Sequence, residues 1–565
     1  MSQPNPSTAL ARAVIDELAR GGVTLFVISP GSRSAALAIA ASDHPELETR
    51  VVLDERSAAF HALGRAKASG APTAVIATSG TAPANHLPAV VEADLSLTPL
   101  VILSADRPIE LRGVGANQTI DQVNLFGPRV RLFSEIPAPD EHSDLNDRWR
   151  KVVSDSVSAS LGVGDKPGPV HINIAFREPT VPVADDGRTE SGDYSFSIEG
   201  KDDGSRWLST THPGSPPIEF SVDYHPHGVV VAGEGVYHRE RLVGVADELG
   251  WPILATAQSG MRGQKVGASY HHLLAGGVPS VLRPELVYAI GAVGPSSRLE
   301  ELISAASVRI RVDSWGRHID PRRNATHILK ADPVAALETL KPLANTDQGW
   351  SDSWLEADRS VEAAMARVID ASRSPTGAAI AKSLDHSAWE SLVVGSSLPI
   401  REVDAHLAHS GEVIANRGAS GIDGFISTAL GVSSVKRRTV ALTGDLGLLH
   451  DANGFLSDSD DDLVIVVVDN DGGGLFDGLP PAQHAPSYER LFVASQEREL
   501  AQLARFHDLD YFETSAISEL PALVDAGLDA GGVSLIRVPV SRRVDLEMRH
   551  QLDDVAREAV GLLET

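Results

Sequence analysis

The sequence predicts an α/β protein of three doubly wound parallel-sheet domains. Apolar runs of strand length alternate with amphipathic helical stretches along the chain, which is the pattern of parallel α/β architecture. A length of 565 residues is too great for one hydrophobic core. Polar breaks lie at 184–206, which is rich in Asp, Gly and Ser, and around 345–350. We therefore predict domains at residues 1–185, 186–347 and 348–565.

The first domain is expected to begin with a helix over 7–20, for which Ser7 or Thr8 is the predicted cap. Apolar runs bounded by turn residues predict the strands that follow. They lie at 24–29, 51–53, 73–77, 100–103 and 170–174. The domain is expected to end near Pro182.

The second and third domains show the same alternation of strands and helices. Strands of the second domain are predicted at 228–233, 252–255, 286–291 and 308–313. The third domain is expected to open with a helix near 354–371. Two of its strands are predicted at 439–443 and 463–468.

Composition excludes several classes of function. Apolar residues make up 42% and charged residues 22% of the chain, as in soluble globular proteins. A formal net charge of −27 argues against nucleic acid or an anionic membrane surface as a partner. Cysteine is absent, which excludes thiolate chemistry. The N-terminus lacks a signal-peptide pattern, and no apolar run reaches membrane-spanning length. A cytoplasmic protein is expected.

Two predicted strands of the third domain end in residues with ligand oxygens. The first runs into a tight turn at Gly444-Asp445-Leu446, and the second into Asp469-Asn470-Asp471-Gly472-Gly473. Ligands of doubly wound sheets bind at the carboxyl ends of strands. A carboxylate, an amide oxygen, a backbone carbonyl and a diphosphate make an octahedral set suited to Mg²⁺. The alternative is two ordinary strand-end turns, where Asp, Asn and Gly are common.

Glu55 is predicted to follow a strand directly and to precede an apolar helix. A carboxylate there can simply cap the helix and favour its dipole. However, Ser29-Pro-Gly-Ser-Arg-Ser and Thr78-Ser-Gly-Thr-Ala also stand at strand-to-helix turns. Glycines 31 and 80 let the backbone approach a flat ligand closely. Three such turns predict a ligand site along one edge of the first sheet.

These motifs resemble those of thiamine-diphosphate enzymes, in which a glutamate-bearing pyrimidine domain, a middle domain and a Gly-Asp…Asn diphosphate domain follow in this order. Within that superfamily the chain resembles the carboligases of the menaquinone pathway. The motifs that carry the resemblance are Ser29-Pro-Gly-Ser-Arg-Ser, Asp54-Glu-Arg-Ser-Ala, Thr78-Ser-Gly-Thr-Ala, Ser104-Ala-Asp-Arg-Pro, Gly115-Ala-Asn-Gln-Thr-Ile-Asp-Gln and Asn416-Arg-Gly-Ala-Ser-Gly-Ile-Asp-Gly. The resemblance spans the first and third domains nearly end to end.

The resemblance implies thiamine diphosphate with Mg²⁺ or Mn²⁺. Asp445, the side chain of Asn470 and the carbonyl of Gly472 match the metal ligands. The glutamate that Glu55 matches hydrogen-bonds the aminopyrimidine ring and promotes the proton transfer that activates the cofactor. Ile422 matches the bulky residue that holds the cofactor bent. The other positions implied to bind the cofactor are Pro30, Thr78, Gly80, Ser420, Gly421, Gly444, Leu446, Gly473, Leu475, Phe476 and Leu479.

The implied substrates, 2-oxoglutarate and isochorismate, are both dianions. An acidic protein needs local guanidinium groups to bind them, because arginine forms paired hydrogen bonds with carboxylates. The resemblance implies that Ser397, Arg401 and Arg417 hold the 2-oxoglutarate part. It assigns isochorismate to Ser32, Arg33, Arg107, Asn117 and Gln118. Any one arginine alone would suggest only a surface ion pair.

One departure from the family concerns the middle domain, where some relatives have a Lys-Arg pair that reaches the site. Here the nearest region is Gly291-Ala-Val-Gly-Pro-Ser-Ser-Arg, so that contribution is absent or has moved to Arg298. The resemblance implies a carboligase (a transferase) that is a homodimer or homotetramer, because domains of different subunits meet at each site. The alternatives are another thiamine-diphosphate enzyme acting on a 2-oxo acid and an inactive binding protein on the same scaffold.

Overall fold

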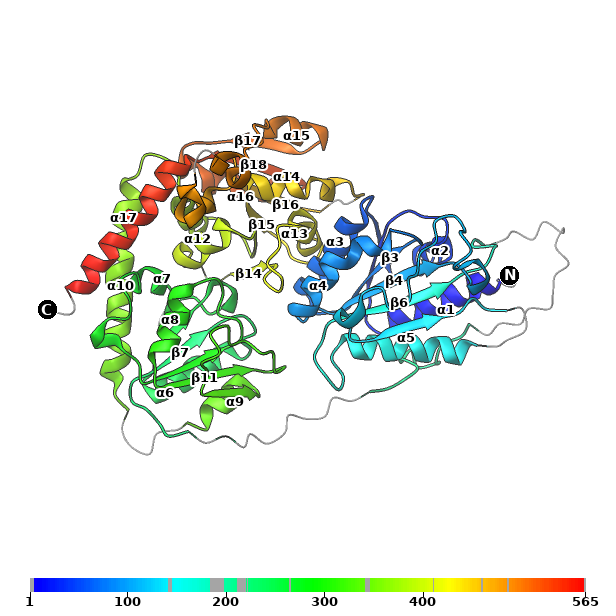
Figure 1. Ribbon diagram of the computed structural model, residues 1–565, viewed down its shortest axis with the longest axis horizontal. Helices are drawn as coiled ribbons and strands as arrows, with labels where there is room; N and C mark the ends of the chain where they lie inside the picture. Colours follow the sequence, from blue (N-terminus) through cyan, green and yellow to red (C-terminus); the bar gives the residue numbers. More distant parts are fainter. Residues whose placement is uncertain are drawn as a thin grey trace. The chain divides into compact units, whose positions relative to one another are not determined.

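The computed structural model describes residues 5–140, 145–182, 198–210, 220, 222–263, 266–340, 346–409, 411–458, 461–484 and 487–562. Within these ranges it forms three six-stranded sheets in which every strand pair is parallel (Figure 1). This confirms the predicted α/β class. The chain divides into two compact units. Unit 1 comprises Met1–Pro213, Asn416–Arg437 and Leu448–Asp462, and unit 2 comprises Gly214–Ala415, Arg438–Gly447 and Leu463–Thr565.

The sheet of unit 1 has the strand order β2-β1-β3-β4-β6-β5. Its strands are β1 (Leu25–Ile28), β2 (Glu48–Val51), β3 (Thr73–Ala77), β4 (Leu100–Asp106), β5 (Phe133–Ile136) and β6 (Pro169–Ala175). Because side chains alternate along a strand, each strand supplies both faces. One face packs on α1 (Pro6–Arg20), α2 (Ala35–Ser42) and α5 (Asn146–Ser160). The other packs on α3 (Glu55–Ser69) and α4 (Leu87–Leu95).

Two predictions for unit 1 were wrong in detail. The cap of α1 is Asn5, whose Oδ1 accepts the backbone N–H of Thr8 at 2.9 Å; neither Ser7 nor Thr8 is the cap. Pro6 stands at the first helical position, where proline is favoured. The predicted strand at 51–53 is β2, which ends at Val51. Glu55 is the first residue of α3 and does not follow the strand directly, because Val52 to Asp54 lie between them. Asp54 caps the helix by accepting the backbone N–H groups of Arg56 and Ser57.

Glycine permits a close helix contact inside unit 1, where α3 packs against α13 (Phe425–Ser433). A Cβ built on Gly64 would lie 2.1 Å from the carbonyl oxygen of Thr428. A Cβ on Gly431 would lie 2.0 Å from the carbonyl oxygen of His61. The two helices therefore touch backbone to backbone at both positions.

Replacing Gly64 by alanine is expected to destabilise the protein by about 1–3 kcal/mol, because the added methyl overpacks a backbone contact. The matched control is Gly244→Ala in α6 (Arg239–Leu249), where a Cβ meets nothing within 4 Å. That change is expected to stabilise by about 0.5–1 kcal/mol, since alanine is the better helix former. Thermal melting checks both signs. Equal melting temperatures for the two variants would contradict the backbone contact.

The middle sheet lies in unit 2 and has the order β12-β11-β10-β7-β8-β9. Its strands are β7 (Gly228–Ala232), β8 (Ile253–Ala255), β9 (Val266–Gly267), β10 (Leu286–Ile290), β11 (Val308–Asp313) and β12 (His327–Lys330). One face packs on α6 and α9 (Pro333–Glu338). The other packs on α7 (Tyr270–Leu273), α8 (Ser297–Ala305), α10 (Gln348–Ala371) and α17 (Arg542–Gly561). Figure 1 shows α10 and α17 lying side by side.

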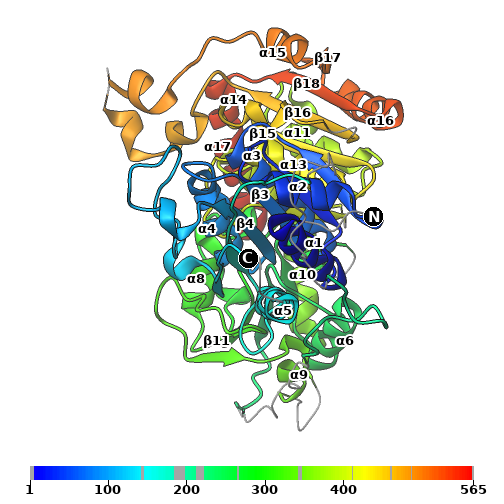
Figure 2. The same cartoon turned by 90° about the vertical axis from the view of Figure 1, so that its right-hand side faces the viewer.

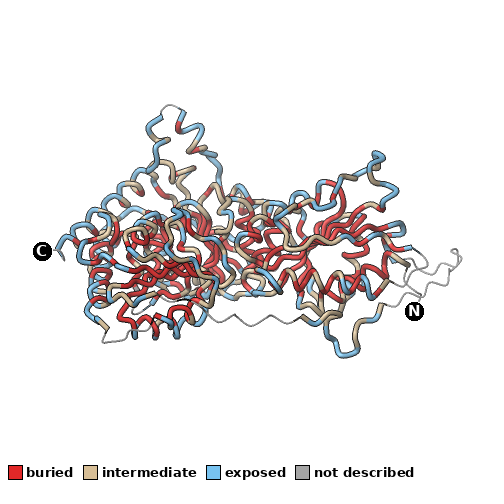
Figure 3. The backbone as a smooth tube through the Cα atoms, turned by 60° about the horizontal axis from the view of Figure 1, so that its bottom comes forward, coloured by how far each residue is buried: buried red, intermediate tan, exposed pale blue. Residues whose placement is uncertain are grey.

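The third sheet, also in unit 2, has the order β14-β13-β15-β16-β18-β17. Its strands are β13 (Ser391–Val394), β14 (Glu412–Ala415), β15 (Thr439–Gly444), β16 (Leu463–Asp469), β17 (Asp510–Glu513) and β18 (Val533–Pro539). Around it lie α11 (Gly377–Ser383), α12 (Leu398–His406), α15 (Leu500–Phe506) and α16 (Leu520–Ala530), and Figure 2 shows α15 and α16 near β17 and β18. The central strands β15 and β16 are buried over most of their length. Figure 3 colours the backbone by burial, with the buried stretches in red.

The third domain differs from its prediction at two helices. Its first helix, α10, begins at Gln348, six residues before the predicted start near 354. The tight turn predicted at Gly444-Asp445-Leu446 is the start of α14 (Asp445–His450). Part of the predicted linker, 184–197, lies outside the described residues. No helix in the described ranges is long and apolar enough to cross a membrane.

Candidate functional site

The carboxyl ends of β2, β1, β3 and β4 stand next to one another at one edge of the first sheet. The segments after these strands carry most of the residues predicted to bind ligands in unit 1. After β1, Pro30 and Ser32 are exposed. Gly31 packs against the next segment, because a Cβ there would lie 2.3 Å from the Cβ of Thr78. Gly31 was predicted to let a ligand approach the backbone; in this structure it allows two neighbouring turns to pack closely.

The turn after β3 is bonded to the segment that follows β4. Ser79 Oγ donates to the carbonyl of Gln118 at 2.9 Å, and Gln118 Nε2 donates back to the carbonyl of Ser79 at 3.1 Å. Gly80 has a φ of +88°, and a Cβ there would lie 2.8 Å from Gln118 Cγ. Its backbone N–H donates to Gln122 Oε1 at 3.0 Å. Glycine is therefore required at position 80 by both conformation and space.

Three predicted substrate residues are brought together after β4. Arg107 Nη2 donates to the carbonyl of Asn117 at 3.1 Å, and the side chains of Asn117 and Gln118 are exposed. Arg33 has different partners from these three residues. It is buried, its Nη1 donates to the carbonyl of Phe176 at 2.9 Å, and its Nη2 lies 3.0 Å from the carboxylate of Glu178. Arg33 thus ties the end of β1 to the segment after β6.

Glu55 lines a hollow of unit 1 together with Leu53, Arg56, Asn85 and Leu456. It is partly buried at the start of α3, where the carboxylate also faces the positive end of the helix dipole. Its carboxylate has no hydrogen bond or ion pair within the part of the chain that the structure describes. The side chain is therefore held in position by its backbone and remains available to a ligand.

The segment 417–422 also belongs to unit 1 and is held by a buried carboxylate. Glu92 accepts the backbone N–H groups of Gly418 at 2.9 Å and Ala419 at 2.6 Å, and it forms an ion pair with Lys67 at 2.9 Å. Arg417 is partly buried. Ser420 has a φ of +61°, and its Oγ donates to the carbonyl of Arg417 at 3.4 Å. Gly421 is partly buried, whereas the Ile422 side chain is 42% exposed, which core packing alone does not explain.

In unit 2 the predicted oxygen ligands follow neighbouring strands. Gly444 at the end of β15 pairs with Val468 of β16, so Asp445 and Asn470 leave the same edge of the third sheet. Asp445 is 4% exposed. Burial, and then the charge of Asp469, raise the pKa of Asp445 to about 7. Arg537 Nε lies 2.5 Å from Asp469 Oδ2, so the ion pair of Arg537 is with Asp469 and not with Asp445. Leu446 continues into α14.

The segment after Asn470 approaches the backbone of residues 492–493. A Cβ on Gly472, whose φ is +128°, would lie 2.3 Å from the carbonyl oxygen of Val493. A Cβ on Gly473 would lie 2.4 Å from the carbonyl oxygen of Phe492. Leu475 and Phe476 are partly buried, and Leu479 is 42% exposed. The two glycines therefore fix the course of the backbone that carries these apolar side chains.

Ser397 is strained at the start of α12, at the same edge of the third sheet. Its φ of 76° and ψ of −128° are rare for any residue but glycine. Such strain costs about 1–3 kcal/mol and persists mainly at functional sites. Arg401 Nη1 donates to the backbone carbonyl of Ser397 at 2.6 Å. Burial, followed by the charge of Arg549, lowers the pKa of Arg401, which has no ion pair among the described residues.

Comparison with known proteins assigns this arrangement to a family. A family model described as "Thiamine pyrophosphate enzyme, N-terminal TPP binding domain" matches residues 8–125. A 2-succinyl-5-enolpyruvyl-6-hydroxy-3-cyclohexene-1-carboxylate synthase of Thermobifida fusca (strain YX) is 39% identical over 573 residues, which cover 98% of this chain and 100% of that protein. The chain belongs to this synthase family. Synthases of the same name from Halobacterium salinarum (strain ATCC 29341 / DSM 671 / R1) and Listeria monocytogenes serovar 1/2a (strain ATCC BAA-679 / EGD-e) are each 36% identical, over 98% and 94% of this chain and 99% and 94% of theirs.

Membership in the synthase family implies thiamine diphosphate with a divalent metal such as Mg²⁺, and the residues of unit 2 fit such a group. Asp445 is a buried carboxylate that has no ion pair with a cationic side chain of the described residues. Asn470 Oδ1 is buried and has no hydrogen-bond partner among the described residues. No group of three His, Cys, Asp or Glu side chains in the described ranges is arranged to hold a metal. A metal here must therefore take mixed oxygen ligands, as the predicted set of side chains, backbone and diphosphate does.

Arg298, to which the contribution of the basic pair could have moved, forms an ion pair with Asp553 in this structure. Its Nη1 and Nη2 lie 2.9 and 2.5 Å from the two carboxylate oxygens of Asp553 on α17, and Nη1 also donates to the carbonyl of His271. A bidentate pair of this kind is geometrically specific. Arg298 therefore ties α8 to the C-terminal helix.

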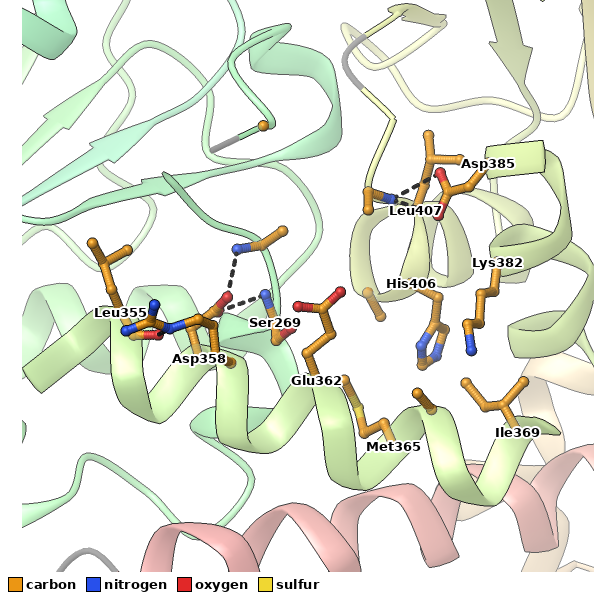
Figure 4. A pocket seen from close by; sticks show the side chains of 16 residues that line it. Ser269, Leu355, Asp358, Glu362, Met365, Ile369, Lys382, Asp385, His406 and Leu407 are labelled. Atoms are coloured by element: carbon orange, nitrogen blue, oxygen red, sulfur yellow. Dashed lines mark hydrogen bonds between the residues drawn. The ribbon is translucent and has the colours of Figure 1, made fainter. Parts of the chain in front are cut away.

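Unit 2 also contains a pocket that none of the predicted synthase residues lines (Figure 4). Leu355, Met365 and Ile369 of α10 form one side, and His406 and Leu407 lie opposite. Asp358 in its wall accepts the backbone N–H of Ser269 at 2.8 Å. The predicted catalytic residues thus lie at sheet edges and not in this pocket.

Proposed function

We propose that this chain catalyses the reaction of its family, with 2-oxoglutarate as donor and isochorismate as acceptor, in menaquinone biosynthesis. The bond between C1 and C2 of 2-oxoglutarate breaks, carbon dioxide leaves, and C2 forms a bond to the ring of isochorismate. The product is 2-succinyl-5-enolpyruvyl-6-hydroxy-3-cyclohexene-1-carboxylate. The observation that carries this proposal is the 39% identity to a synthase of that name across 98% of the chain.

The residues proposed to bind the cofactor fall into two groups, one in each unit. Asp445, the Asn470 side chain and the Gly472 carbonyl would hold the metal, and Gly473, Leu475, Phe476 and Leu479 would surround the cofactor. When bound, thiamine diphosphate supplies the electron sink that decarboxylation of a 2-oxo acid requires. Glu55 would hold and exchange a proton at the aminopyrimidine, a role open to a carboxylate that has no hydrogen bond or ion pair among the described residues. Pro30, Thr78, Gly80, Ser420, Gly421 and Ile422 would line the pyrimidine side.

The bonding of each arginine indicates whether it is available to a substrate carboxylate. Arg401 has no ion pair among the described residues, so its guanidinium group can take a donor carboxylate. The family pattern assigns Ser397 and Arg417 to the same substrate. Arg107, Asn117, Gln118 and Ser32 would face isochorismate. Arg33 already holds Glu178 and Phe176, so a role for it in binding requires exchange of that ion pair.

The remaining parts of the proposal concern assembly. We propose that two copies of the chain bring the Glu55 half and the Asp445 half together, which requires at least a homodimer. We also propose a cytoplasmic location and the domain boundaries 1–185, 186–347 and 348–565. Sedimentation with and without thiamine diphosphate and Mg²⁺ tests the assembly, and a monomer that is fully active would overturn it.

Donor selectivity tests the proposed function most directly. Carbon dioxide release in the presence of isochorismate is expected to be faster with 2-oxoglutarate than with pyruvate by roughly 10²-fold. Pyruvate lacks the second carboxylate, so a partly buried arginine would lose its charged hydrogen-bond partner. Equal turnover of the two donors would instead assign another carboligase activity. Cofactor binding without carbon dioxide release from either donor would assign an inactive binding protein.

A further inference from the structure

A buried polar network lies beneath the carboxyl edge of the first sheet. Alternation along β4 and β6 puts Ser104, Asp106 and Asn173 on the same face as the apolar residues Leu100 and Ile102. Ser104 and Asn173 are direct partners in the register of the two strands. All three polar side chains are fully buried. Buried polar groups of this kind need partners, and here they find them in one another.

Asp106 is the residue through which this network reaches Arg107. Asp106 Oδ1 accepts the backbone N–H of Arg107 at 2.7 Å, and Oδ2 accepts Asn173 Nδ2 at 2.8 Å and lies 3.0 Å from Arg112 Nη2. Arg112 Nε in turn donates to the backbone carbonyl of Arg107 at 2.8 Å. Both polar groups of the Arg107 backbone are therefore held, the N–H by Asp106 and the carbonyl by Arg112.

The same network reaches Gly80 through Gln122. Asn173 Oδ1 accepts Ser104 Oγ at 2.8 Å and Gln122 Nε2 at 3.0 Å. Gln122 Oε1 then accepts the backbone N–H of Gly80 at 3.0 Å. Gln122 is 1% exposed, so water does not offer an alternative partner. A continuous chain of hydrogen bonds thus joins the Gly80 turn to the backbone of Arg107.

We propose that Asp106, Asn173 and Gln122 are positioning residues that hold the Gly80 turn and Arg107 in fixed register, and so align the cofactor with the acceptor substrate. This inference rests on the proposed function, in which Gly80 contacts the pyrimidine and Arg107 faces isochorismate. None of the three side chains needs to touch either ligand. They act because a small displacement of a binding group weakens its interaction steeply.

The network differs from an ordinary buried polar cluster because its hydrogen bonds end at the backbone of Gly80 and of Arg107. Burial raises the pKa of Asp106, and the hydrogen bond from Asn173 opposes that rise, so the carboxylate depends on its donors to stay ionised. Asn173 connects the two ends because its amide donates to Asp106 and accepts from Gln122. A side chain with only one of these functions would break the connection.

Gln122→Met tests the inference, because it keeps the volume and removes both the donor and the acceptor of the side-chain amide. The Kd of thiamine diphosphate, measured by calorimetry with Mg²⁺ on the cofactor-free full chain, is expected to rise roughly tenfold. The KM for isochorismate is expected to rise by a similar factor while kcat changes little. Arg112→Lys is the milder second variant, since it keeps the charge beside Asp106. It is expected to raise the KM for isochorismate and to leave the cofactor Kd unchanged.

Ser160→Ala is the matched control. Ser160 is fully buried and its Oγ donates to the carbonyl of Gly168 at 2.9 Å, just before β6 at the amino edge of the sheet. It is expected to lower the melting temperature as Gln122→Met does, with Kd and KM unchanged. If Gln122→Met also changes only the melting temperature, the inference is overturned. A wild-type enzyme that does not turn over isochorismate overturns the proposed function instead, and the cofactor Kd still tests the Gly80 end of the network.

Discussion

Glu55→Gln is expected to lower turnover by about 10²–10⁴-fold while thiamine diphosphate still binds with nearly wild-type affinity. The amide keeps the size of the carboxylate and its position at the start of α3, but it cannot take up and return a proton at neutral pH. The affinity should survive because the diphosphate and metal contacts are proposed to lie in unit 2. Steady-state kinetics at saturating cofactor, together with calorimetry, measures the two effects separately.

Glu240→Gln provides the control for this change. Glu240 lies in the first turn of α6 and is exposed, so both substitutions remove a carboxylate from a helix N-terminus. Each is expected to cost about 0.3–1 kcal/mol through the helix dipole. Only Glu55→Gln should affect turnover. Near-normal kcat in Glu55→Gln would refute the proton role and leave Glu55 as a residue that favours the dipole of α3.

The strand ends of the site could be predicted because two local signals agree there. An apolar run such as Leu463–Asp469 has the length and the β-branched content of a buried strand, and the Asn-Asp-Gly-Gly that follows ends it. Parallel α/β architecture then places the ends of neighbouring strands at one edge. The sequence therefore indicated Asp445 and Asn470 together, and the register of β15 and β16 confirms that they leave the same edge.

Short strands at the edge of a sheet could not be predicted, because they lack an apolar run. Asp510–Glu513 is the outer strand β17 and is mostly exposed, so it carries no apolar run. The start of α14 was predicted as a turn because Gly444 and Asp445, residue types common in turns, follow an apolar run. Gly447 has a packing reason, since a Cβ there would lie 2.5 Å from Thr443 Oγ1. Tertiary contact overrides helix propensity at that position.

The network of Asp106, Asn173 and Gln122 shows a different limit. Polar residues at alternate positions of two buried strands were visible in the sequence, and this alternation is the signal that could have found them. Their partnership was not, because β4 pairs with β6 and not with β5, which follows it in the chain. The positive φ of Ser397 and the ion pair that occupies Arg33 likewise depend on tertiary structure.

Asp445→Asn is expected to abolish the stabilisation that Mg²⁺ and thiamine diphosphate give together, and to leave the cofactor-free protein at least as stable as the wild type. The second effect has a clear sign: the Asp445 carboxylate is buried without an ion pair to any described residue, and an amide costs less to bury. A wild-type protein at 100 times the Kd of its ligand gains about 2.7 kcal/mol, whereas the variant should gain almost nothing. Thermal melting with and without metal and cofactor measures both effects.

Asp471→Asn separates the metal site from a general loss of charge. Asp471 is exposed, and its carboxylate accepts Ser495 Oγ at 2.6 Å and the backbone N–H of Glu497 at 3.2 Å. Its oxygens are thus occupied by protein donors, whereas Asn470 Oδ1 is buried without one in the described part of the chain. The Asp471 variant should keep the full shift in melting temperature on addition of Mg²⁺ and cofactor. The same shift in the Asp445 variant would show that the metal is bound elsewhere.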